Sequence, residues 1–143
     1  MTDPGSGDVW RYPYLWSWQA ERGETEGRKP RPVTLAAVVP IRSTKTMLYL
    51  LPITSLPPDE DRDTLEIPIT EARRVGLADE RQLWIVLDEH NRDILEQSYH
   101  FDPDGRIGTF SRAFIAQVAA RFHAAYLQRG AANRVDRTEP LSG

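Results

Sequence analysis

The sequence predicts a mainly β domain, in which a small, strongly curved antiparallel sheet or barrel is covered by one C-terminal α-helix. Two β-branched, apolar runs, residues 33–41 and 46–53, flank a short polar turn and indicate a hairpin. A third apolar run, residues 82–87, is typical of a central strand. After Ser111, a good N-cap residue, apolar side chains recur every three or four positions as far as Gly130, which predicts an amphipathic helix packed on the sheet.

The length of 143 residues fits one domain, which we expect over residues 7–130, between a flexible N-terminus (1–6) and a flexible tail (131–143). No apolar run approaches the roughly 20 residues of a membrane span, and the first residues lack the pattern of a signal peptide. We therefore expect a cytoplasmic protein with no membrane contact. The absence of cysteine excludes disulfides, thiolate catalysis and cysteine zinc sites.

Charge is distributed unevenly along the chain. The net charge of −3 divides into +2 for residues 1–58, −9 for residues 59–105 and +4 for residues 106–143. A surface that contacts phosphates needs local rather than global positive charge, so nucleic-acid binding remains compatible with this sequence, although the acidic middle segment argues against it.

The first strand is expected near Trp10 and to end near Tyr12, because Pro13 cannot continue a central ladder. Aromatic residues fall at every second position here: Trp10, Tyr12, Tyr14, Trp16 and Trp18. We expect the first two in the core and a turn of helix over residues 16–22. Trp16 and Trp18 either cover the core or, in an exposed loop, stack on unpaired bases.

The remaining connections follow from turn and breaker residues. We expect a long polar loop over residues 21–27, an edge strand over 64–68, a helical turn over 71–75 closed by Gly76, and a tight turn over 102–105.

Three cations, Arg28, Lys29 and Arg31, directly precede the first strand of the hairpin. Pro30 and Pro32 remove backbone donors and favour an extended lead-in, which would hold the cations on a stiff segment. They either solvate the end of the strand or are aimed at an anion.

Two acidic stretches offer further chemistry. Residues 59–63 are either a solvated loop or a Mg²⁺ site built on Asp59, Asp61 and Asp63. Residues 88–93 put a row of polar groups after the central strand, where His90 is either a hydrogen-bonded surface residue or a proton shuttle.

Several motifs, in order along the chain, resemble the MazF/PemK family of toxin endoribonucleases. They are Gly7-Asp8-Val9-Trp10, Arg31-Pro32-Val33-Thr34-Leu35, Pro52-Ile53-Thr54-Ser55, the acidic stretch 88–92 and the closing helix 112–129. The resemblance implies an SH3-like small antiparallel β-barrel, as in MazF/PemK-like and CcdB-like proteins. It also implies a homodimer that cleaves single-stranded RNA without a metal or cofactor, arrests growth and is neutralised by a cognate antitoxin.

By the same resemblance, Arg31 would hold the scissile phosphate and Thr54 would be its catalytic neighbour, although Arg28 could compete with Arg31. Arginine suits this role because its fixed, permanently charged donors match the charge on a phosphate attacked by a 2′-OH. Thr54 is too weak a base to act unaided, so it would position or hydrogen-bond the phosphate. The other candidate substrate contacts are Lys29, Ser55, Trp16, Trp18, Glu24 and Arg92.

Two alternatives stay open beside the endoribonuclease. The aromatic segment 10–18 would also suit a non-catalytic interaction module that binds a partner peptide or protein, because tryptophan and tyrosine dominate interface hot spots. The aspartates of residues 59–63 would suit a metal nuclease, although no histidine lies near them in the sequence.

Overall fold

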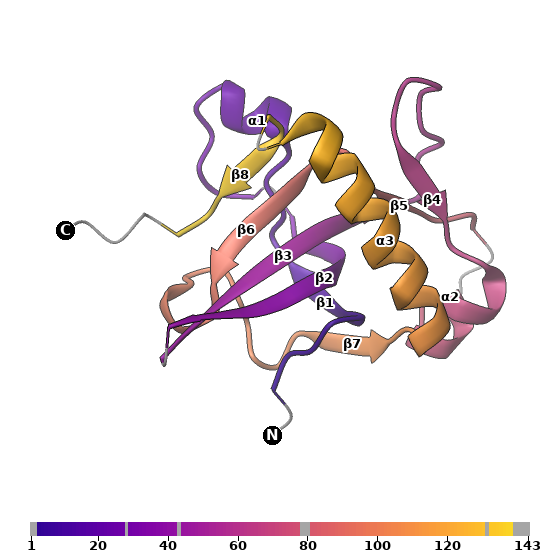
Figure 1. The fold of residues 1–143 in the computed structure, drawn as a ribbon, viewed down its shortest axis with the longest axis horizontal. Coiled ribbons are helices and arrows are strands. Elements are labelled where there is room, and N and C mark those ends of the chain that lie inside the picture. Colours follow the sequence, from indigo (N-terminus) through magenta and orange to yellow (C-terminus); the bar gives the residue numbers. More distant parts are fainter. Residues whose placement is uncertain (1–2, 28, 43, 78–80, 131, 139–143) are drawn as a thin grey trace.

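A computed structural model describes residues 3–138 except 28, 43, 78–80 and 131. Within them the protein is a mainly β structure with three α-helices, and the long helix lies near its C-terminal end (Figure 1). The strands are β1 (Asp8–Tyr12), β2 (Arg31–Arg42), β3 (Lys45–Thr54), β4 (Thr64–Glu66), β5 (Trp84–Val86), β6 (His90–Ile94), β7 (Arg106–Thr109) and β8 (Arg134–Asp136). The helices are α1 (Ser17–Glu21), α2 (Ile69–Val75) and α3 (Arg112–Arg129), with a 3₁₀ turn η1 (Leu95–Gln97).

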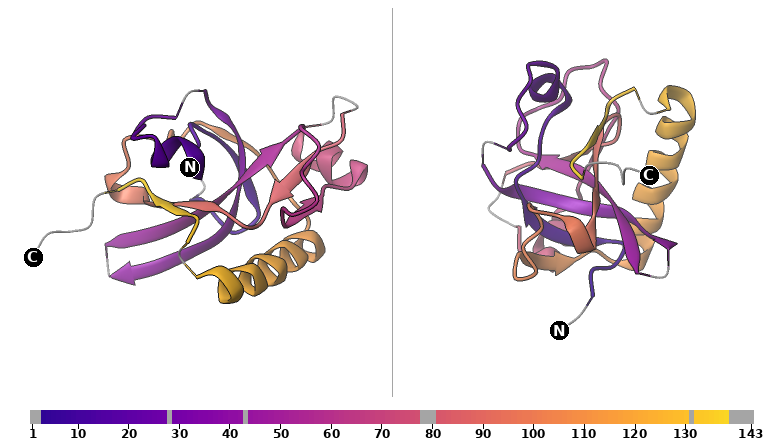
Figure 2. Two further views of the ribbon diagram at one scale, coloured as in Figure 1. Left: turned by 90° about the horizontal axis from the view of Figure 1, so that it is seen from above. Right: turned by 90° about the vertical axis from the view of Figure 1, so that its left-hand side faces the viewer.

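The strands form one sheet in the order β4-β5-β3-β2-β1-β7, and β6 pairs with β3 beside β5. All these pairings are antiparallel, whereas β8 adds to β6 in parallel. The described part of β4 does not pair with β7, so the sheet is curved but open (Figure 2). The expected mainly β, antiparallel fold with a C-terminal helix is therefore confirmed, and closure into a barrel is not seen. No described helix has the length and apolar character to cross a bilayer.

The β2–β3 hairpin brings the two residues of the expected site together. Its register pairs Val33 with Pro52, after a shift near Leu35. Extending this register by two residues sets Arg31, which begins β2, opposite Thr54, which ends β3. Side chains opposite each other in an antiparallel pair project to the same face, so the hairpin itself puts these two residues at one end of the sheet.

The core lies on both faces of the sheet. On one face α3 packs Phe114, Val118, Phe122 and Ala125 against the sheet. Ser111 caps this helix by accepting a hydrogen bond from the Phe114 N–H, as expected. The other face buries a cluster that includes Trp10 and Tyr12, whose place in the core is confirmed; its buried members are Trp10, Tyr12, Tyr14, Val33, Leu35, Leu48 and Leu50.

The stretch 88–93 is not the exposed polar strand end that the sequence suggested. Residues 90–94 form β6, and His90 is only 3 % exposed, among the rings of Tyr49, Phe122 and Tyr126. The surface interpretation of His90 is therefore wrong. The polar side chains of this strand are buried because partners distant in the sequence satisfy them, as Tyr12 does when its hydroxyl donates to Asp93.

The expectation of a flexible tail is wrong for residues 134–138, because β8 pairs with β6 and Thr138 donates to Asp93. Arg137 anchors this segment: its Nη1 donates to the Pro13 carbonyl (2.8 Å) and to Asn91 Oδ1 (3.0 Å). Residues 131 and 139–143 lie outside the described residues. At the other end of the chain, Ser6 donates to the Ala36 carbonyl, so ordered contacts begin before residue 7.

Candidate functional site

A pocket of about 450 Å³ lies between the loop that follows β1 and the loop that follows β3. Both loops rise from the same end of the molecule (Figures 1 and 2). The first loop with α1 and the start of β2 contributes one wall, lined by Tyr14, Trp16, Trp18, Gln19, Lys29 and Arg31. The opposite wall is lined by Thr54, Leu56, Pro57, Pro58, Asp59, Arg62, Thr64 and Val86. The volume falls in the range of small-ligand sites.

Arg31 is the half-buried cation of this pocket. Its guanidinium carbon lies 5.1 Å from the centre of the Trp16 ring, and within the described residues it has no carboxylate or hydrogen-bond partner. Burial lowers the pKa of Arg31 from its ordinary value, but a guanidinium remains charged at any physiological pH. A charged, partly desolvated fork without a protein anion is suited to binding an anionic ligand.

Thr54 lies on the other wall of the same pocket. Its Oγ1 accepts a hydrogen bond from the Leu56 N–H at 3.1 Å. This bond fixes the hydroxyl oxygen, and the hydroxyl proton is left to donate. A bound phosphate could therefore receive charge-assisted hydrogen bonds from Arg31 and a further one from Thr54.

The α1 wall is apolar and aromatic. The Trp16 ring meets the Tyr14 ring edge-on, with centroids 5.2 Å apart, and Trp18 is 42 % exposed beneath the Arg22 guanidinium. The side chain of Gln19 reaches back to accept a hydrogen bond from the Trp16 N–H at 3.0 Å. This short helix therefore holds two indoles beside the pocket opposite residues 56–58.

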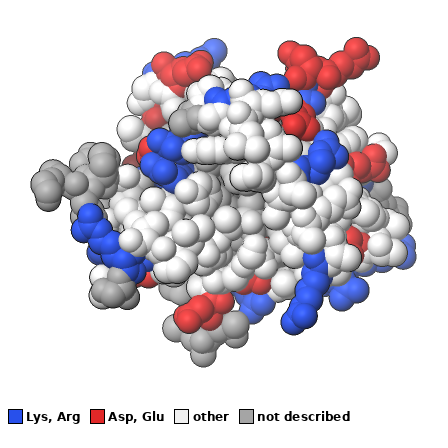
Figure 3. Space-filling model, in the orientation of Figure 1, with Lys and Arg blue, Asp and Glu red and all other residues white. Residues whose placement is uncertain are grey.

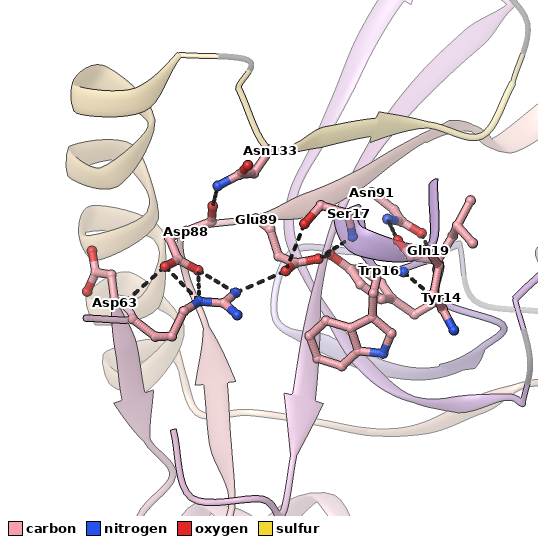
Figure 4. Close-up of polar contacts among 11 residues, drawn as sticks. Tyr14, Trp16, Ser17, Gln19, Asp63, Asp88, Glu89, Asn91 and Asn133 are labelled. Carbon is pink, nitrogen blue, oxygen red and sulfur yellow. Dashed lines mark hydrogen bonds and ion pairs between the residues drawn. The ribbon is translucent and has the colours of Figure 1, made fainter. Parts of the chain in front are cut away.

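A buried carboxylate network connects the two walls (Figure 4). Glu89, 2 % exposed, accepts hydrogen bonds from the Tyr14 hydroxyl (3.1 Å) and the Ser17 N–H (3.0 Å) of the first loop. Its other oxygen accepts one from Arg62 Nη2 (2.9 Å), and Arg62 also forks onto Asp88. The first loop and the β3–β4 loop are thus held at a fixed separation by one charged cluster.

The protonation states within this network follow from its contacts. Burial would raise the pKa of Asp88, but the hydrogen bonds from Arg62 and from the Asp63 N–H outweigh it and hold that pKa below its usual value. The Asp88 hydrogen bond raises the pKa of Arg62 in turn. Burial and Glu89 raise the pKa of Tyr14 well above its ordinary value, so its hydroxyl stays a donor. Arg62 stays protonated, but its positive charge is compensated by Asp88 and Glu89, so it is not available to an anionic ligand in the way that Arg31 is.

Not every candidate residue reaches this pocket. Arg31, Thr54, Lys29, Trp16 and Trp18 line it, whereas Ser55 and Glu24 do not. Arg92 is separated from it: it lies in β6 and pairs with Asp136 at 2.7 Å, beside a different hollow. Arg28 lies outside the described residues.

Sequence reasoning assigned base selectivity to two loops, residues 16–26 and 56–63, and both contribute to the pocket, but it did not single out Gln19, Arg62 or the Leu56–Pro58 segment within them. Gln19 had a signal, since it stands three residues after Trp16 at the start of a helical turn, the position of a side chain that caps the turn. No local sequence pattern indicated the role of Arg62, because its partners, Asp88 and Glu89, are distant in the sequence.

Within the described residues, no group of three or more histidine, aspartate or glutamate side chains is placed to hold a metal ion. Part of the acidic stretch 59–63 serves internal contacts instead, since Asp63 receives Arg121 at 3.1 Å. The three-aspartate metal site is therefore not assembled in the part of the chain that the structure describes.

The face shown in Figure 3 carries scattered charges of both signs around a largely uncharged middle. No continuous basic stripe runs across the described residues of that face. The cations relevant to an anionic ligand are instead Lys29 and Arg31 in the pocket.

A scan of the sequence against protein-family models found no match, and a search of curated proteins found none either. The functional argument therefore depends on the geometry of the pocket and on the motif resemblance alone.

Proposed function

We propose that this protein is a metal-independent, sequence-selective endoribonuclease, the toxin of a type II toxin–antitoxin system, as the resemblance to the MazF/PemK family implies. The observation that carries the proposal is that Arg31 and Thr54, twenty-three positions apart, line one pocket together. Lys29 adds charge for a neighbouring phosphate, and two tryptophans offer surfaces on which unpaired bases stack.

The proposed reaction is attack of a ribose 2′-oxygen on the adjacent phosphorus. The bond from phosphorus to the 5′-oxygen breaks, which leaves a 2′,3′-cyclic phosphate and a 5′-hydroxyl. Arg31 donates to the non-bridging oxygens as their charge grows, and the Thr54 hydroxyl donates to one of them. The 2′-hydroxyl proton passes to water or to Asp59, the carboxylate of the described lining, and the leaving oxygen takes a proton from water.

The wider family properties belong to the same proposal. The open, curved sheet would be a variant of the SH3-like barrel, two copies would form a homodimer, and an antitoxin would neutralise it by filling the pocket. Because the walls are largely apolar, a segment carrying both carboxylates and apolar side chains would suit that role.

The deciding experiment incubates the purified protein with a long single-stranded RNA in EDTA and maps the cleavage sites. Arg31→Ala should lower the cleavage rate by about 10²–10³-fold and abolish growth arrest, because a positioned donor to the reacting charge is lost. Arg112→Ala, which removes an exposed arginine at the start of α3, is the matched control. Equal cleavage by folded Arg31→Ala and wild type would overturn the role of Arg31, and an intact RNA would overturn the proposal.

A second candidate, a non-catalytic interaction module, is favoured by the apolar surfaces of Trp16, Trp18 and residues 56–58 around the pocket. The two functions differ in their salt dependence. Affinity for RNA should fall steeply between about 50 and 200 mM salt, whereas an apolar peptide should be nearly indifferent to it.

A further inference from the structure

Gln19 is a buried polar side chain whose amide nitrogen makes no hydrogen bond to a described residue. The residue is only 3 % exposed, yet it lines the pocket. Its Oε1 accepts the hydrogen bond from the Trp16 N–H, and because a backbone N–H can only donate, this contact fixes which end of the amide is oxygen. Nε2 must therefore point elsewhere, and it has no hydrogen-bond partner among the described residues.

The nitrogen is not sealed in the interior. The side-chain atoms that are both buried and unpartnered, within the described residues, are His90 Nε2 and Arg137 Nη2. Gln19 Nε2 therefore remains accessible, and the pocket is the cavity that Gln19 lines. Water can accept from this donor while the pocket is open. A ligand that fills the pocket displaces that water, and the donor then needs an acceptor on the ligand.

The surroundings indicate what kind of ligand group lies against this donor. Trp16 and Trp18 line the pocket from the first loop, and Leu56, Pro57 and Pro58 line it from the β3–β4 loop. Apolar and aromatic walls with a fixed polar group between them are suited to a planar heterocycle that stacks and is read at its edge. Arg31 and Lys29, at the same pocket, would hold the phosphates on either side of it.

We propose that Gln19 is a specificity-determining residue that donates from Nε2 to O4 of uracil or O6 of guanine, so that these keto bases are preferred over cytosine and adenine, which carry an amino group at the corresponding position. The inference rests on the proposed function, because it takes single-stranded RNA as the ligand. Uracil and cytosine have nearly the same shape, but uracil has an acceptor at the position where cytosine has an amino group. Two donors facing each other leave both unpaired, so the amino base is rejected.

The test separates binding from cleavage by using short oligonucleotides of deoxyuridine and of deoxycytidine, which lack the attacking 2′-hydroxyl, and by following tryptophan fluorescence. Wild type should bind the uracil oligonucleotide about two- to ten-fold more tightly, which corresponds to one net hydrogen bond. Gln19→Glu retains the oxygen that receives the Trp16 N–H and replaces the donor by an acceptor, so it should lose or invert the ratio of the two affinities. Gln117→Glu, an exposed site on α3, adds the same charge elsewhere and should retain the ratio.

The outcomes distinguish the two proposals. If wild type binds both oligonucleotides equally, or Gln19→Glu keeps the wild-type ratio, the role of Gln19 is overturned while cleavage through Arg31 stands. If wild type shows the ratio and Gln19→Glu removes it, the inference is supported even where RNA is not cleaved. If folded wild type binds neither oligonucleotide, both proposals fall. The comparison in wild type needs no variant, so a failure of Gln19→Glu to fold does not remove the test.

Discussion

The guanidinium of Arg31 lies over the ring of Trp16, 5.1 Å from its centre. The two residues come from different segments, the start of β2 and the loop before α1, so an aromatic neighbour aligns the guanidinium that we propose to hold the phosphate. A cation–π contact is worth about 0.5–2 kcal/mol, depending on how far it is desolvated. This contact fixes the direction of the donor fork before any ligand binds.

Arg31→Lys should therefore be more than a conservative change. Lysine keeps the charge but loses the planar fork and its stacking on Trp16. Loss of about 0.5–2 kcal/mol corresponds to a fall of about 2- to 30-fold in the rate of RNA cleavage, smaller than the loss in Arg31→Ala. Single-turnover cleavage assays would measure it, and a lysine variant as fast as wild type would show that charge alone suffices.

Thr54→Val tests the hydroxyl with almost no change in shape. The Leu56 N–H loses its acceptor, which should cost about 0.5–1.5 kcal/mol in the free energy of unfolding by urea. Cleavage should fall as well, because the phosphate loses a donor. Thr54→Ser should preserve both quantities, and a valine variant that cleaves normally would remove Thr54 from the mechanism.

Glu89→Gln should loosen the connection between the two walls. The substitution removes the charge that Arg62 Nη2 contacts and places an amide donor among existing donors. Because Arg62 is about one-third exposed and keeps Asp88, we expect a loss near the low end for a broken buried pair, about 2–3 kcal/mol in urea unfolding. Glu60→Gln, an exposed site in the neighbouring loop, should change stability by less than about 0.5 kcal/mol. Equal stability of the two variants would contradict the role of the cluster.

His90 makes stability dependent on pH. Burial, assisted by Arg134 and Arg92 and opposed by Asp136, lowers the pKa of His90 from 6.5 to about 4. Around it lie the uncharged rings of Tyr49, Phe122 and Tyr126. Between these two pKa values the unfolded chain binds a proton that the folded chain does not. The folded state therefore keeps its full stability with respect to His90 above pH 6.5. As the pH falls from 6.5 towards 4, the free energy of unfolding decreases by up to about 3 kcal/mol.

The measurement is the free energy of unfolding at pH 7 and pH 4.5 for wild type and His90→Phe. Phenylalanine fits an aromatic setting and removes the unpartnered Nε2, so the variant should lose about 2–3 kcal/mol less than wild type on acidification. The lowered pKa of Asp88 changes the free energy of unfolding mainly below pH 3.8, its ordinary value, and therefore has little effect between pH 7 and pH 4.5. Parallel pH profiles for the two proteins would refute the assignment.

Much of the fold could be predicted from local pattern. The β2–β3 hairpin, α3 with its Ser111 cap and the turn from Asp102 to Gly105 all follow from apolar periodicity or from turn and cap residues, which act within a few positions. The hairpin also sufficed to place Arg31 near Thr54, since register alone brings them to one end.

The remainder depended on contacts between distant residues. β6 looked too polar to be buried, because its partners are remote: the Tyr12 hydroxyl serves Asp93 across 81 positions. β8 has three residues and no apolar pattern, so only pairing with β6 reveals it. Gln19 and Arg62 lie in loops that sequence reasoning assigned to base selectivity, but neither could be singled out, because the role of an amide or a guanidinium depends on the groups that surround it.

The anchoring of Arg137 has a practical consequence for anyone preparing the protein. The Arg137 guanidinium donates hydrogen bonds to the Pro13 carbonyl and to Asn91 Oδ1, and the Asn91 side chain is hydrogen-bonded to both the N–H and the carbonyl of Leu15. These bonds hold the loop that carries the two indoles of the pocket. A shortened protein that ends at Gly130 would retain every side chain that lines the pocket, but it would lose the hydrogen bonds from Arg137 that hold this loop. Affinity tags and fluorescent fusions are therefore better attached before β1, where they leave the hydrogen bonds of Arg137 intact.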